Sequence, residues 1–195
     1  MDGDMQSQVL VFGVLILGAW FQAGHSTAAQ LPTAAVKAGT KEYCNQTYMY
    51  CLELPSVGTV EPHLGDSPNH GVSIKLPADE GVVWSYAHWD AALLKSARQA
   101  LTARIGLLIV EHPNAEIRIK PTKLARLPAF LITLAGEDNA PSRQVILVAY
   151  RAPQEESEGP GIIYEIGINC HGDACTDRIG DFEQVARTFR ISPNH

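Results

Sequence analysis

The sequence lacks an excess of basic residues. Its 15 lysines and arginines are outnumbered by 21 aspartates and glutamates, which gives a net charge of −6. A nucleic-acid-binding protein needs a basic surface to neutralise phosphates, so this composition argues against nucleic acid as a partner. Charged residues make up only 18% of the chain and apolar residues 46%. The chain can therefore build a packed core, and extensive disorder is not expected.

Long apolar runs are also missing. The run Val9–Phe21 has 13 residues, whereas a membrane-spanning helix needs about 20. This length suits the core of a signal peptide, and Thr27 and Ala29 supply small residues at the −3 and −1 positions. We therefore predict a signal peptide over residues 1–29, with membrane contact only if it stays uncleaved. The leading residues contain two aspartates and no basic residue, so a buried apolar helix of the folded domain is the alternative.

Cysteine is scarce, and all four cysteines follow the predicted cleavage site, at Cys44, Cys51, Cys170 and Cys175. An even number in an exported chain predicts two disulfides. Three pairings exist. We favour Cys44–Cys51 and Cys170–Cys175 because each pair is close in sequence and flanks a predicted bend; cross-pairing is the alternative. The C-x6-C and C-x4-C spacings differ from zinc-binding motifs, so no metal site is predicted.

The remainder is predicted to form a flexible lead-in over residues 30–42 and a single domain over residues 43–192. Runs rich in apolar and β-branched residues predict seven strands. They are Thr47–Leu54, Gly71–Leu76, Gly81–Tyr86, Glu116–Lys120, Ala129–Leu134, Gln144–Arg151 and Ile162–Asn169. The second and third strands are separated by a short turn and are expected to form a hairpin.

Helical periodicity predicts two helices. The first is Trp89–Leu108, with apolar residues on one face and Asp90 in its first turn. The second is Asp181–Ile191, with Asp177 or Asp181 as its cap. Its apolar face is formed by Phe182, Val185, Ala186 and Phe189. Two helices among seven strands predict an α+β fold, with a curved, mostly antiparallel sheet of about six or seven strands flanked by both helices.

This order of elements resembles the PsbP/DcrB-like families. The segments that carry the resemblance are Tyr50–Pro55 (YCLELP), Ile162–Ile168 (IIYEIGI) and Phe182–Ile191 (FEQVARTFRI), within roughly Tyr43–Ser192. The resemblance implies an α/β/α sandwich and a non-catalytic envelope or lumenal protein that acts through partners. It assigns no catalytic or cofactor-binding residue. The four cysteines are not part of the general pattern of these families.

One loop contains residues that could serve chemistry. Gly65-Asp66-Ser67 resembles the nucleophile motif of SGNH-type hydrolases, with His63 or His70 as the base. The motif lies in a loop rich in proline and glycine, and the C-terminal third has no Asp-x-x-His pair, so a simple turn is favoured. His63, Asp66 and His70 also suit zinc, but a third nitrogen ligand is missing nearby.

Aromatic residues suggest either packing or ligand binding. Trp84, Tyr86 and Trp89 would form a binding platform if they lay exposed on one face; core packing is favoured because aromatic residues in strands usually pack. His88-Trp89-Asp90 is interpreted as a capping and packing cluster at the start of the first helix.

Two further patterns have simpler interpretations. Cys170 beside His171 could be a reactive thiol, but a disulfide with Cys175 is favoured in an oxidising compartment. Asn45-Gln46-Thr47 fits the glycosylation acceptor pattern, which matters only in a eukaryotic secretory route.

We therefore predict a non-catalytic secreted or periplasmic accessory or binding protein, without catalytic residues, cofactor or metal, that acts through an unidentified protein partner in the cell envelope. One alternative is an exported serine hydrolase using Ser67. The other is a secreted enzyme inhibitor or immunity-type protein.

Overall fold

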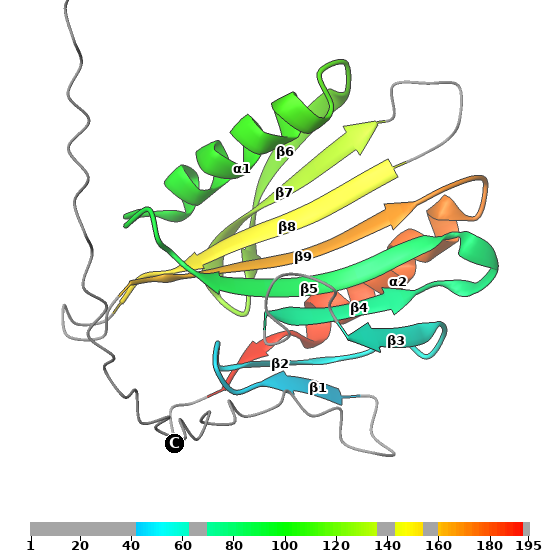
Figure 1. Cartoon of the computed structure of the whole chain (residues 1–195), viewed down its shortest axis with the longest axis horizontal. Helices are drawn as coiled ribbons and strands as arrows, with labels where there is room; N and C mark the ends of the chain where they lie inside the picture. Colours follow the sequence, from blue (N-terminus) through cyan, green and yellow to red (C-terminus); the bar gives the residue numbers. More distant parts are fainter. Residues whose placement is uncertain (1–41, 63–69, 136–142, 154–159, 193–195) are drawn as a thin grey trace, which may run out of the picture. The chain divides into compact units, whose positions relative to one another are not determined.

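The computed structural model describes residues 42–62, 70–135, 143–153 and 160–192. The predicted signal peptide and nearly all of the lead-in lie outside these residues. The described part contains ten strands and two α-helices (Figure 1). They are β1 (Glu42–Asn45), β2 (Tyr50–Glu53), β3 (Thr59–Pro62), β4 (Gly71–Lys75), β5 (Gly81–Trp89), α1 (Ala97–Glu111), β6 (Glu116–Leu124), β7 (Leu127–Ala135), β8 (Arg143–Arg151), β9 (Ile162–Cys170), α2 (Cys175–Thr188) and β10 (Arg190–Ile191).

The central sheet has seven strands in the order β3-β4-β5-β9-β8-β7-β6, and every neighbouring pair is antiparallel. A smaller antiparallel sheet has the order β1-β2-β10. The predicted α+β class is confirmed, as is the hairpin that β4 and β5 form.

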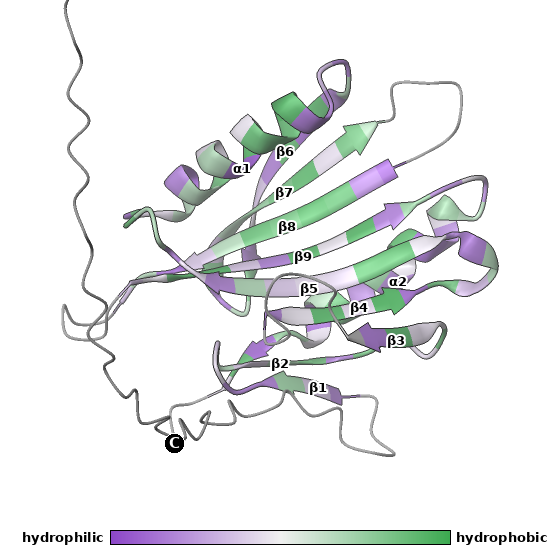
Figure 2. Cartoon of the chain, viewed as in Figure 1, coloured by the Kyte–Doolittle hydropathy of each residue, from purple (hydrophilic) through white to green (hydrophobic). Residues whose placement is uncertain are grey.

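The two faces of the central sheet pack against different elements. Successive residues of a strand point to opposite faces. On β8, Ile146 and Val148 pack in the cluster that contains α1, whereas Val145 and Leu147 pack in the cluster that contains α2 and the smaller sheet. Figure 2 shows that β7 and β8 are largely hydrophobic, and each strand contributes residues to both clusters.

The apolar face of α2 is buried as predicted. Phe182, Val185 and Phe189 expose 4% of their surface or less. Phe189 stacks on Tyr50 with ring centroids 5.3 Å apart and meets the edge of Tyr164 at 5.4 Å. These ring contacts join the C-terminal end of α2 to both sheets.

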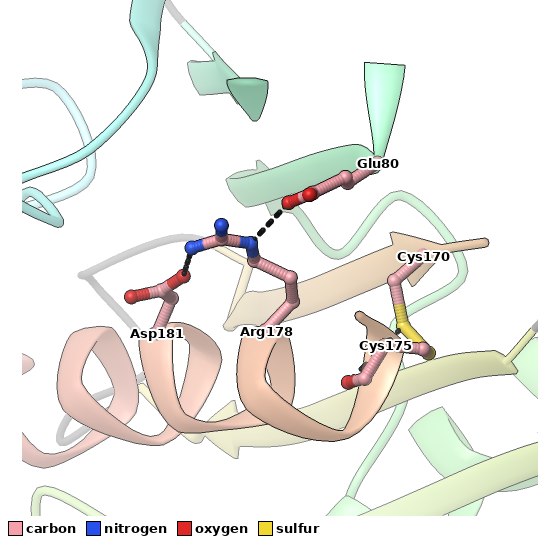
Figure 3. Close-up of polar contacts among 5 residues, drawn as sticks. All are labelled: Glu80, Cys170, Cys175, Arg178 and Asp181. Atoms are coloured by element: carbon pink, nitrogen blue, oxygen red, sulfur yellow. Dashed lines mark hydrogen bonds and ion pairs between the residues drawn. A yellow bond between two sulfur atoms is a disulfide. The ribbon is translucent and has the colours of Figure 1, made fainter. Parts of the chain in front are cut away.

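The predicted start and cap of α2 are wrong. The helix begins at Cys175, six residues before Asp181, and Ala174 at its N-cap offers no side-chain acceptor. Asp181 pairs with Arg178 instead of capping the helix. The guanidinium of Arg178 donates to the carboxylate of Glu80 at 2.5 Å and to that of Asp181 at 3.2 Å (Figure 3). Asp181 is therefore held by an arginine of its own helix.

The predicted start of α1 is also wrong. Trp89 ends β5, and the helix begins at Ala97 because Ser96 accepts a hydrogen bond from the backbone N–H of Gln99 (3.3 Å). Asp90 is buried in the preceding turn, where it accepts the N–H of Ala92 at 3.1 Å. Leu93, an apolar residue within the predicted helix, is 72% exposed.

The predicted strand Thr47–Leu54 proves to be a turn followed by a strand. The Asn45 side-chain oxygen accepts the N–H of Tyr48 (3.1 Å), and Met49 has φ 54°, so the chain reverses between β1 and β2. The end of the predicted second helix also differs, because Ile191 lies in β10 and pairs with Tyr50.

Candidate functional site

Both disulfides join cysteines that are neighbours in sequence. Cys44 bonds Cys51 across the β1–β2 hairpin, and Cys170 bonds Cys175 between β9 and α2 (Figure 3). The described residues therefore contain no free thiol, and His171 has no thiol partner for nucleophilic chemistry. Glu42 lies close to Cys44 and Cys51, but sulfurs joined to each other are poor metal ligands.

The loop that contains the candidate residues of the hydrolase and zinc hypotheses lies mostly outside the described residues. This applies to His63, Asp66 and Ser67. His70 is described, and its Nδ1 lies 3.0 Å from the carbonyl oxygen of Ala87 and 3.3 Å from the hydroxyl of Tyr48. Among the described residues, His70 also stacks on the ring of Tyr86, with ring centroids 5.3 Å apart.

Asn45 is an unsuitable glycan acceptor in the folded domain. Its side chain is 2% exposed, and its amide nitrogen donates to the hydroxyl of Tyr43 at 3.2 Å. Attachment would have to precede folding.

The proposed aromatic platform is divided between two faces. Trp84 packs against the cluster that contains α1, and its indole covers Gly167 of β9. Tyr86 lies two residues further along β5 and stacks on His70, with ring centroids 5.3 Å apart. Trp89 lies at a position of β5 that faces the opposite side of the sheet from Trp84. Its ring contacts that of Tyr48, with ring centroids 5.5 Å apart. The prediction of packing holds for Trp84, whereas Trp89 remains 40% exposed.

A buried ion pair lies where α1 crosses the sheet. Glu165 of β9 is 9% exposed and lies 3.4 Å from Arg104 of α1. Burial raises the pKa of the Glu165 carboxyl above 4.5, while Arg104 and His88 oppose the shift. Nothing in the local sequence pattern predicts this pair, since the alternation of β9 would place an apolar residue at position 165.

A first cleft, of about 910 Å³, lies at the end of β5 beside the Cys44–Cys51 disulfide. Trp89, Met49 and Ile162 supply apolar walls, and Arg151 is the only charged residue among the described residues that line it. Its volume is within the range of small-molecule sites.

A second cleft, of about 860 Å³, is the α2 groove. It lies between α2 and the half of the sheet formed by β6, β7 and β8, because α2 packs instead on β9, β5 and β2. Leu131, Val145, Leu147, Phe182 and Ala186 form its apolar floor. Among the described residues, the charged ones that line it are four cations and two acids: Arg118, Lys123, Arg143, Arg187, Glu116 and Glu183. Sequence reasoning missed the groove because its residues come from four separate elements.

No family model and no curated protein matches the chain. Solved structures do resemble it, among them those of LpqN and PsbP (CyanoP). LpqN, a Mycobacterium tuberculosis protein involved in cell envelope biogenesis, has 14% identity, a TM-score of 0.54, and covers 74% of this chain and 83% of its own. PsbP (CyanoP) of the cyanobacterium Synechocystis sp. PCC 6803 has 12% identity, a TM-score of 0.55, and covers 87% of this chain and 98% of its own. At this identity the likeness shows the fold alone. The chain therefore has a PsbP-like fold, as the sequence resemblance predicted.

Neither α1 nor α2, the helices of the described part, is long and apolar enough to cross a membrane.

Proposed function

We propose that this chain is a non-catalytic accessory protein that binds a protein partner in the cell envelope or secretory space. The observation that carries the proposal is the α2 groove, an open cleft with an apolar floor and a charged rim. Open apolar surfaces of this kind mark interaction sites. The envelope role of LpqN, a protein of the same fold, agrees with it.

Export to an oxidising compartment is part of the proposal. Two disulfides in a domain of this size are typical of secreted or periplasmic proteins. The predicted signal peptide over residues 1–29 supplies the route.

Cross-linking of the full-length chain in its native cells tests the proposal. We expect formaldehyde to trap one reproducible protein adduct, identified by mass spectrometry of the excised band. A serine-reactive fluorophosphonate probe on the purified protein tests the alternative. Labelling that disappears in Ser67→Ala would establish the hydrolase and defeat the proposal. A trapped enzyme whose activity the purified chain suppresses would instead favour the inhibitor hypothesis.

A further inference from the structure

We infer that the α2 groove binds an acidic amphipathic helix of the protein partner. This inference rests on the proposed function and specifies the chemistry of the partner's contacting segment. Four properties of the groove support it: its width, its length, its apolar floor and its charge.

The width of the groove matches one helix. It spans three strands, β6, β7 and β8, and two inter-strand spacings amount to about 10 Å. An α-helix with its side chains is about 10–12 Å across. A helix laid here would lie beside α2 and extend the layer that α2 begins on this face.

The length is also that of a helix. Arg143 pairs with Ala135 at one end of β7, and Lys123 pairs with Pro128 near the other. The seven residue steps between Ala135 and Pro128 correspond to about 24 Å of strand, or roughly 16 residues of α-helix. A single small molecule would occupy only part of this span.

The floor requires an apolar face on the occupant. Val145, Leu147 and Phe182 are buried beneath it, while Leu131 and Ala186 remain partly exposed. An amphipathic helix covers such a floor with residues at i, i+3, i+4 and i+7. Addition of a strand at the free edge of β6 is disfavoured, because Pro121 removes a backbone donor within that edge.

The rim requires an acidic flank on the occupant. Arg118 pairs with Glu116 at 2.8 Å and Arg187 with Glu183 at 2.7 Å, but all four side chains are more than half exposed. Such pairs are weak and exchange readily for a new anion. Lys123 and Arg143 form no ion pair among the described residues, and they lie toward opposite ends of the groove.

A synthetic helix tests the inference directly. The probe is a fluorescein-labelled 16-residue peptide with leucines at the four apolar positions and glutamates on the flanks. A matched peptide carries lysine in place of each glutamate. We expect the acidic peptide alone to bind, with amide shifts in the NMR spectrum confined to β6, β7, β8 and α2.

Charge reversal locates the site. Lys123→Glu with Arg143→Glu should weaken binding of the acidic peptide about tenfold, because rim charges are lost and two repulsions are gained. Lys95→Glu with Arg98→Glu is the matched control, since it makes the same change in net charge on exposed residues near the start of α1. Circular dichroism and thermal unfolding confirm that both variants fold.

Three outcomes would overturn the inference: equal binding of the basic peptide, equal weakening by both double variants, or binding to phosphatidylglycerol vesicles without binding to either peptide. The native adduct separates this inference from the proposed function. An adduct that forms equally in Lys123→Glu/Arg143→Glu leaves the proposed function intact and refutes the groove as the site. The absence of any adduct in the wild type refutes the proposed function.

Discussion

At the residue scale, Glu165 shows how burial alters titration. Its raised folded pKa means that the folded protein keeps a proton that the unfolded chain releases near pH 4.5. The free energy of unfolding should therefore fall as pH rises from about 4.5 toward the folded pKa. Glu165→Gln should remove this contribution. The difference in the free energy of unfolding between variant and wild type, measured by urea titration, should therefore change with pH over that interval. If the free energy of unfolding had the same pH dependence in both proteins, the prediction would be contradicted.

Glu116 provides a control, because its pKa is shifted in the direction opposite to that of Glu165. Its hydrogen bond and ion pair with Arg118 lower the pKa of this exposed carboxyl below 4.5. The contribution of Glu116 is thus present above pH 4.5 and is lost as pH falls through the folded pKa. Glu116→Gln should therefore change the pH dependence in the direction opposite to Glu165→Gln, and by less, because water screens the exposed pair.

Substitution by alanine should change the stability of the protein in opposite directions at two glycines. A Cβ on Gly167 would lie 2.3 Å from the Trp84 ring, so the indole must move, and we expect a loss of about 1–3 kcal/mol. Gly106 lies within α1 and a Cβ there meets nothing within 4 Å, so alanine should stabilise by about 0.5–1 kcal/mol. Urea unfolding of both variants measures this. Equal effects would mean that Trp84 does not pack on Gly167.

At the element scale, the sequence predicted six of the seven strands of the central sheet and missed β3, whereas it misplaced the start of both helices. Alternation and β-branched residues identified β4 through β9, because burial on a sheet imposes that pattern. The start of α1 was misplaced because Leu93 and Leu94 continue its apolar spacing. The pair Ser96 and Gln99 fits a capping box and was the usable signal.

Other features depended on contacts between distant segments. The strand β10 forms because Ile191 pairs with Tyr50 in a hairpin far away in sequence. The Arg104–Glu165 pair and the α2 groove likewise join separate elements. A local pattern contains no information on such neighbours, which is why the fold class was predictable and the candidate site was not.

The disulfides tie neighbouring elements together, and their removal tests that role. Cys170→Ser with Cys175→Ser opens the link between β9 and α2, and we expect a loss of about 2 kcal/mol because the closed loop is short. Chemical denaturation under non-reducing conditions measures the change. Mass spectrometry of non-reduced peptides checks the pairing, and a Cys51–Cys175 peptide would contradict it.

At the scale of the whole molecule, charge is distributed unevenly. The net charge is −6, yet the described lining of the α2 groove carries four cations and two acids. Long-range repulsion from the rest of the protein therefore disfavours non-specific anions, whereas an acidic helix gains local attraction on reaching the groove. This contrast favours a partner that combines acidic and apolar contacts over one that supplies charge alone.

Export decides where such a partner is met. If residues 1–29 form a signal peptide, the mature chain should begin at Gln30, because Thr27 and Ala29 present small side chains to the signal peptidase. N-terminal sequencing of protein from the exported fraction measures this. Ala29→Tyr should block cleavage and leave the chain tethered by Val9–Phe21, whereas Gln30→Asn should be processed normally. Recovery of an intact Met1–Ala29 segment in the wild type, protected from protease together with the domain, would instead establish it as part of the core.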